Sequence, residues 1–101
     1  MAGPLHEARE DLTEHALDLH RAIQSLIEEL DAVDWYEQRL TAATDDELRA
    51  ILVHNRDEEK EHAAMLIEWL RRKDGKFEEE LKDYLFTDAP LAEIEEGETT
   101  S

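Results

Sequence analysis

The sequence predicts an all-α protein: an antiparallel two-helix hairpin followed by a short C-terminal helix. Charged residues make up 39 % of the 101 residues, and glycine and proline together occupy five positions, so little interrupts long helices. No window alternates apolar and polar residues with β-branched side chains, as a strand would. We expect a helical domain over residues 1–86 and an acidic, disordered tail over residues 87–101.

Composition excludes several classes of function. The formal net charge of −17 disfavours nucleic acid, whose phosphates require a basic face, and also anionic membrane surfaces. The absence of cysteine removes disulfides, thiolate zinc sites and cysteine nucleophiles, and fits a cytoplasmic or otherwise reducing setting. No apolar run approaches membrane-spanning length, and no segment resembles a signal peptide.

The first helix is expected from about Glu7 to Leu40. Glu37 interrupts its apolar row, whose members recur at a spacing of three to four residues: Leu12, Leu19, Ile23, Leu26, Leu30, Val33 and Leu40. Thr44 and Glu47 then form a capping box that predicts the start of a second helix. Because the loop between them is short, the two helices should form an antiparallel hairpin.

The second helix is expected to end near Gly75, after basic residues in its last turn. A short third helix follows, which Pro90 ends; its apolar face comprises Phe77, Leu81, Tyr84 and Leu85. Two long helices and a short one cannot bury both amphipathic faces by themselves. We therefore expect an obligate oligomer.

The second helix interrupts its own apolar pattern with "HNRDEEKEH", residues 54–62, which contains no apolar side chain. Glu59 and His62 occupy consecutive positions of its heptad seam, which is made of Leu48, Leu52, Asn55, Glu59, His62, Leu66 and Trp69. A carboxylate in an apolar seam is unfavourable unless it is paired or binds a cation. Side chains three residues apart on a helix can close on one ion.

Glu-x-x-His on one helix and a lone glutamate on another form half of the ligand set of a carboxylate-bridged di-iron bundle. Glu29, beside the apolar stripe of the first helix, is the candidate lone carboxylate. Two chains related by a two-fold axis would supply the whole set. The alternative is a buried polar patch of Asn55, Glu59 and His62 that fixes helix register, with the remaining charges solvated.

Two segments, "EELDAVDWYEQR" (residues 28–39) and "ILVHNRDEEKEHAAMLIEWLRR" (residues 51–72), closely resemble the encapsulated ferritins, over about residues 20–86. The resemblance implies a half-ferritin whose two-helix chains dimerise into a ferritin-like four-helix bundle and so complete a di-iron ferroxidase centre. It also implies that the pairs assemble into a ring inside an encapsulin shell, which stores the iron.

By position, the resemblance makes Glu29, Glu59 and His62 the iron ligands. It places Glu28 and Asp31 at an outer metal-attracting site, where the shorter aspartate stands for the glutamate of the family, with Trp35 beside it. A further surface metal site is implied at three residues that independently share one helical stripe: His54, Glu58 and Glu61. These surface sites are expected to take calcium or other divalent ions.

Tyr36 follows Glu29 by seven residues on the same stripe, and it is expected either to pack there or to stand behind the ligands. The resulting prediction is an iron:oxygen oxidoreductase that oxidises Fe(II) with O₂ and lies inside a cytoplasmic encapsulin nanocompartment. The alternative is a non-catalytic helical metal-binding or interaction protein, in which an ion staples the dimer. Encapsulated ferritins end in a shell-targeting peptide, whereas the printed sequence ends at "GETTS", as a shortened form of a longer chain would.

Overall fold

The computed structural model describes the backbone of residues 4–100 and the side chains of residues 4–97, and all of the regular structure in that range is helical. The chain divides into two compact units, with the boundary after Trp69. None of the described helices is long and apolar enough to cross a membrane. The helices are η1 (Arg9–Asp11), α1 (Glu14–Ala42), α2 (Asp46–Lys73), α3 (Gly75–Tyr84) and α4 (Leu91–Thr100).

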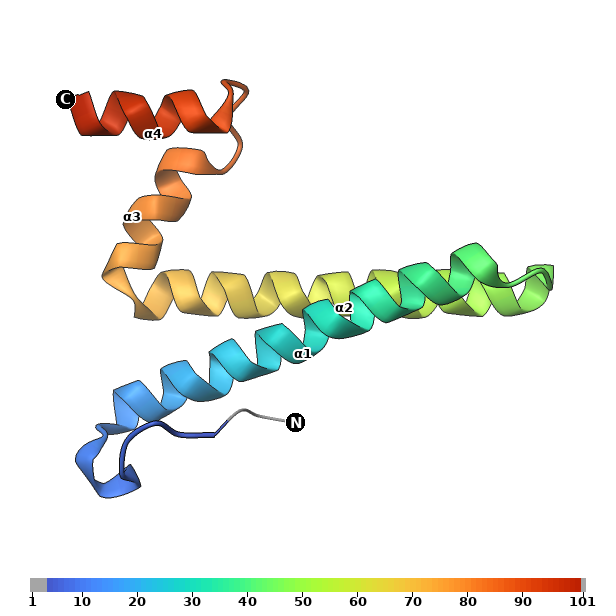
Figure 1. The fold of residues 1–101 in the computed structure, drawn as a ribbon, viewed down its shortest axis with the longest axis horizontal. Helices are drawn as coiled ribbons and strands as arrows, with labels where there is room; N and C mark the ends of the chain where they lie inside the picture. The colour runs from blue at the N-terminus through green and yellow to red at the C-terminus, as the bar shows by residue number, and fades with distance from the viewer. Residues whose placement is uncertain (1–3, 101) are drawn as a thin grey trace. The chain divides into compact units, whose positions relative to one another are not determined.

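In the first unit, α1 and α2 form the predicted antiparallel hairpin (Figure 1). The polar contacts that cross between them include three that define the register. The Arg49 side chain donates to the Leu40 carbonyl, Arg56 pairs with Glu37, and His62 approaches Glu29. As the α2 partner moves from 49 to 62, the α1 partner moves back from 40 to 29, which is the antiparallel register.

The buried rows of the two helices match the predicted seams only in part, because Leu40 belongs to the predicted row whereas Ala22 does not. On α1 the buried residues include Ala22 and Leu40, and on α2 they include Ala63 and Leu70. The predicted seam of α2 lies beside this row, because Leu48 is 46 % exposed and the His62 side chain is 45 % exposed. A heptad pattern read from sequence cannot distinguish the face that meets the other helix of the hairpin from an adjacent apolar face.

A second set of large apolar side chains is exposed on the hairpin. On α1 the first three, from Ile23 to Leu30, follow a three- to four-residue spacing and share one stripe, whereas Trp35 comes five residues later. The exposed members are Ile23, Ile27, Leu30 and Trp35 on α1, and Leu48, Ile51, Met65 and Ile67 on α2. This much exposed apolar surface on a small chain is typical of a protein–protein contact surface.

Both long helices begin later than the sequence patterns indicate. α1 begins at Glu14, where the Thr13 hydroxyl accepts a hydrogen bond from the Ala16 amide at 3.0 Å, and η1 replaces the expected first turn. α2 is capped by Asp45, whose carboxylate accepts from the Leu48 amide at 2.8 Å. The expected cap at Thr44 is therefore wrong by one residue, since an aspartate caps as well as a threonine or better.

In the second unit, Asp74 separates α2 from α3 and caps α3 by accepting from the Phe77 amide at 2.9 Å. Gly75 is the first residue of α3 rather than a left-handed helix stop, and its φ is negative. α3 ends at Tyr84, well before Pro90. Phe86, just beyond it, has a φ of 60° and a fully exposed side chain, a conformation uncommon for a non-glycine residue.

Beyond the predicted short helix, the structure places a further helix, α4, at Leu91–Thr100, in contact with α3. Pro90 starts this helix: its carbonyl accepts hydrogen bonds from the amides of Glu93 and Ile94. Proline is favoured at helix starts because the first amides of a helix have no acceptor within it, and proline has no amide hydrogen. Glu93 in the first turn interacts favourably with the helix dipole. The division of the chain at residue 86 and the disorder of residues 87–101 stay predictions.

Candidate metal centre

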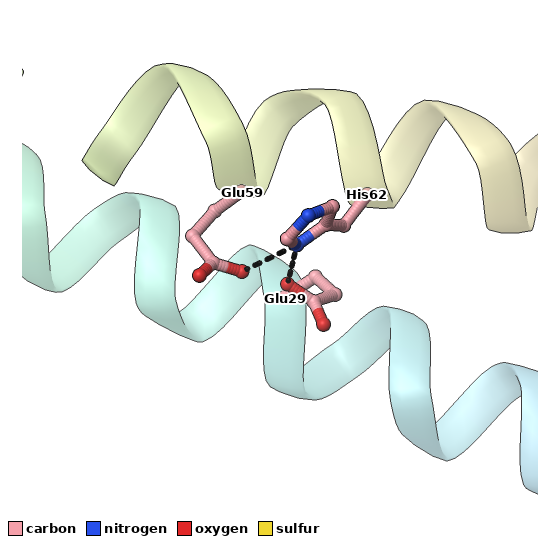
Figure 2. A group of neighbouring side chains, drawn as sticks. All are labelled: Glu29, Glu59 and His62. Carbon is pink, nitrogen blue, oxygen red and sulfur yellow. Dashed lines mark hydrogen bonds and ion pairs between the residues drawn. The ribbon is translucent and has the colours of Figure 1, made fainter. Parts of the chain in front are cut away.

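Three potential ligands converge in the hairpin, one from α1 and two from α2. The Nδ1 atom of His62 lies 3.4 Å from Glu29 Oε2 and 3.4 Å from Glu59 Oε2. One ligand atom of each residue lies within 4.8 Å of the others. Figure 2 shows both carboxylates turned toward the same imidazole nitrogen. We refer to Glu29, Glu59 and His62 as the triad.

Helix geometry explains why these residues meet. Glu59 and His62 are three residues apart, so they project from the same side of α2. Glu29 lies seven residues after the buried Ala22, so it belongs to the row of α1 that faces α2. The triad is therefore fixed by the hairpin register rather than by a flexible loop.

The Glu29 carboxylate is the strongest indication that the triad fits a cation. Its Oε2 atom is buried and has no hydrogen-bond partner among the described residues. The contact of this oxygen with His62 is an ion-pair contact only. A buried carboxylate oxygen that lacks a donor is unfavourable by about 1–3 kcal/mol or more. A bound cation would satisfy this oxygen and offset the proximity of the Glu59 charge.

The donor set is two carboxylates and one imidazole. Such mixed oxygen and nitrogen ligands suit Fe(II), Mn(II) and Zn(II), and they leave coordination positions open because three protein donors fill only part of a metal shell. Glu29 and Glu59 side chains are 26 % and 24 % exposed, whereas His62 is 45 % exposed. The triad therefore has an open side where further ligands can enter.

The other predicted metal residues do not form such a group. His54 Nε2 lies 3.2 Å from Glu58 Oε1, but both side chains are more than half exposed. Within residues 4–97, the triad is the group in which three or more acidic or imidazole ligands converge. Glu61 therefore does not join His54 and Glu58 in a group of this kind. Glu28 and Asp31 do not form one either. These two surface sites stay predictions.

The two aromatic residues near the predicted centre differ in environment. Trp35 is 52 % exposed. Tyr36 is half-buried, and the guanidinium carbon of Arg39 lies 5.5 Å from the centre of its ring, within range of a cation–π contact. Their assignment beside the ligands stays a prediction.

Sequence reasoning missed one ionic group next to the triad. Arg56 Nη1 lies 3.1 Å from Glu37 Oε2, and its Nη2 lies 3.0 Å from Asp57 Oδ1. Hydrogen bonds to Asp57 and Glu37 raise the pKa of Arg56 above its ordinary value. The available signal was Glu37 itself, which interrupts the apolar row of α1 because it pairs with an arginine on α2.

Comparisons with known proteins identify the family. A family model described as EncFtn-like matches residues 4–88. The encapsulated ferritin-like protein of Rhodospirillum rubrum is 61 % identical over 94 residues, which cover 93 % of this chain and 67 % of the relative. The ferritin-like protein of Thermotoga maritima is 54 % identical over 96 residues, which cover 95 % and 84 %.

The crystal structure of protein ne0167 from Nitrosomonas europaea matches this fold with a TM-score of 0.85 and 60 % identity, covering 89 % of this chain and 99 % of that one. The resemblance seen in residues 28–39 and 51–72 is thus confirmed over nearly the whole helical chain. With a converging Glu-Glu-His group on an all-α hairpin, the chain belongs to the EncFtn-like family, the family of the encapsulated ferritin-like proteins.

Proposed function

We propose that this protein is a ferroxidase that oxidises Fe(II) to Fe(III) with O₂ at a di-iron centre shared by two chains. The observation that carries the proposal is the triad, with a buried Glu29 oxygen that has no hydrogen-bond donor. The family supports iron as the substrate, because the donor set alone suits several divalent metals.

The charges of the triad favour the oxidised product. Each Fe(II) loses one electron to O₂, and protons from solvent complete the reduction of oxygen. The anionic Glu29 and Glu59 stabilise Fe(III) more than Fe(II), since the attraction grows with the charge of the ion. His62 supplies a neutral nitrogen ligand, and the open side of the triad gives O₂ a way to reach the metal.

A second chain is proposed to complete the centre. One hairpin offers two carboxylates and one imidazole, which is half of a di-iron ligand set. The exposed stripe of Ile23, Ile27 and Leu30 supports pairing, because its burial would supply hydrophobic stabilisation. We assign Trp35 and Tyr36 to the surroundings of the paired centre.

The proposal extends to the surface and to the compartment. Glu28 with Asp31, and His54 with Glu58 and Glu61, are proposed to hold divalent cations weakly on the way to the centre. The relative from Rhodospirillum rubrum is named an encapsulated ferritin-like protein. By that kinship, rings of this protein are proposed to work inside an encapsulin shell that stores the Fe(III).

Oxygen uptake after anaerobic loading with Fe(II) tests the function. We expect rapid uptake by the wild type and a fall of about 100-fold or more for Glu59→Ala and for His62→Ala, since loss of a ligand exceeds the 10–100-fold effect of outer partners. Glu79→Ala, an exposed change on α3, is the control. Fe(II) binding without oxygen uptake would instead favour a metal-stapled, non-catalytic dimer.

Anomalous diffraction at the iron edge tests where the metal lies. The proposal requires two irons between the Glu59 residues of two chains. Iron enclosed by the hairpin of a single chain, with no ligand from a second copy, contradicts the shared centre.

A further inference from the structure

We propose that Arg56 is a positioning residue of the metal centre: its ion pair with Glu37 sets the register in which α2 presents Glu59 and His62 to Glu29. The assignment rests on the proposed metal chemistry of the triad. It concerns side chains that do not themselves contact the metal.

The first observation is the burial and pairing of Arg56. Its side chain is only 20 % exposed, although an arginine side chain is normally well solvated. Two carboxylates from different helices hold its guanidinium, with Glu37 on α1 at 3.1 Å and Asp57 on α2 at 3.0 Å. The guanidinium of Arg56 therefore joins the two helices.

The second observation is the position of Arg56 within α2. It lies three residues before Glu59, one helical turn away, and seven residues before the buried Ala63. Arg56 thus occupies the row that faces α1, directly beside the triad. Glu37 lies two turns beyond Glu29 on α1, so the pair braces the two helices on the loop side of the triad.

The third observation is the contrast between the two sides of the triad. On the side away from the loop, the buried side chains are apolar and make no directional contact: Leu17, Ala22, Ala63 and Leu70. On the loop side, the guanidinium of Arg56 makes a directional contact with a carboxylate. Apolar contacts tolerate small axial shifts, whereas a hydrogen-bonded ion pair holds one register.

Small shifts matter here because the three ligand atoms already lie within 4.8 Å of one another. Metal coordination distances vary by only about 0.2 Å. A helix slide of one residue moves a side chain by about 1.5 Å. The ion pair of Arg56 therefore limits axial shifts of α2 against α1 more tightly than the apolar contacts of the hairpin do, and so keeps the ligand atoms within coordination distance.

The test compares two nearly isosteric variants that each neutralise one partner of Arg56. Glu37→Gln weakens the contact between helices, whereas Asp57→Asn weakens the contact within α2. We expect Glu37→Gln to weaken Co(II) binding by about tenfold, which is the usual effect of losing a residue that orients a metal ligand. The Co(II) absorption spectrum should change as well, because the ligand geometry changes. Asp57→Asn should stay within about twofold of wild type, because a neighbour on the same helix cannot set the register between helices.

Metal-free melting temperatures complete the experiment. A positioning role predicts that the two variants have similar melting temperatures but different Co(II) affinities. Equal Co(II) affinities, or a loss of affinity in Glu37→Gln that only follows a lower melting temperature, overturn the proposal. If wild type binds Co(II) through the triad but consumes no O₂ with Fe(II), the ferroxidase proposal fails while the positioning role stands.

Discussion

At the scale of single residues, Glu29 is held in a position that is unfavourable for a carboxylate without a bound cation. Its Oε2 atom is buried without a hydrogen-bond donor, and the Glu59 carboxylate approaches the same imidazole nitrogen. Neither a core residue nor a solvated surface residue would be placed in this way. Buried polar groups without partners cluster at binding and catalytic sites, because the bound ligand supplies the missing partner.

Glu29→Gln should separate these two roles. At pH 8 we expect the metal-free protein to gain about 0.5 kcal/mol, a rise of about 2–4 °C in melting temperature, because one of two neighbouring carboxylates becomes neutral. The same change should weaken Co(II) binding at least tenfold, since an amide is a poorer ligand than a carboxylate.

Thermal unfolding followed by circular dichroism, with and without Co(II), measures both effects. Asp34→Asn, an exposed change on the same helix and outside the proposed metal sites, controls for the altered net charge. A metal-free protein that melts lower after Glu29→Gln would mean that the carboxylate is held by favourable contacts and is not a vacant ligand.

At the scale of helices, the sequence predicted the elements better than their ends. The hairpin and the short helix after it follow from apolar periodicity, which is an average over many residues and tolerates single errors. Helix ends depend on one hydrogen bond each, so neighbouring candidates such as Thr44 and Asp45 cannot be separated by pattern alone. Pro90 was misread because proline can end one helix or begin another.

The triad was predictable for the same reason that the helices were. Spacing along α2 places Glu59 and His62 together, and the apolar rows narrow the choice on α1 to Glu29. Glu37, which interrupts the apolar row of α1, indicated that a polar partner was needed, but its pairing with Arg56 was not predictable because it depends on the register between helices. A chain with 28 acidic residues offers too many possible partners for each arginine.

The cap of α2 gives a direct test at this scale. Asp45→Ala should destabilise the protein by about 1 kcal/mol, because the Leu48 amide loses its acceptor at the helix start. Thr44→Ala should change stability by less than about 0.5 kcal/mol, as most surface substitutions do. Urea unfolding of the metal-free protein measures which of the two substitutions lowers the free energy of unfolding more. An equal or larger loss for Thr44→Ala would mean that the capping box at Thr44 starts α2 after all.

At the scale of the whole molecule, charge and apolar surface act in opposite directions. A net charge of −17 makes copies of the chain repel one another, whereas the exposed apolar residues of the hairpin favour their association. In the proposed pair, the carboxylates of Glu29, Glu59 and their counterparts add repulsion at close range. A divalent cation bound among them removes part of this repulsion.

Metal should therefore promote assembly. Because the shared centre exists only in the paired state, Fe(II) or Co(II) must shift the equilibrium toward it by linkage. We expect static light scattering to show a larger assembled fraction with metal, most clearly at low salt, where charge repulsion is least screened.

The triad variants should divide in this assay. Glu59→Ala removes repulsion together with a ligand, so we expect it to assemble without metal. His62→Ala keeps the carboxylates, so its assembly should still depend on metal. Assembly that is identical in all three proteins, with or without metal, would contradict the link between the centre and the pair.

The incomplete ligand set of a single hairpin also has a genetic consequence. In the proposed pair every centre draws on two polypeptides, so a defective copy disables the centres of its intact partners. When normal and defective copies are equally abundant and mix at random, only about a quarter of the pairs are fully normal. A mutant allele at Glu59 or His62 would then act as a dominant-negative one, in contrast to an enzyme whose ligands all come from one polypeptide.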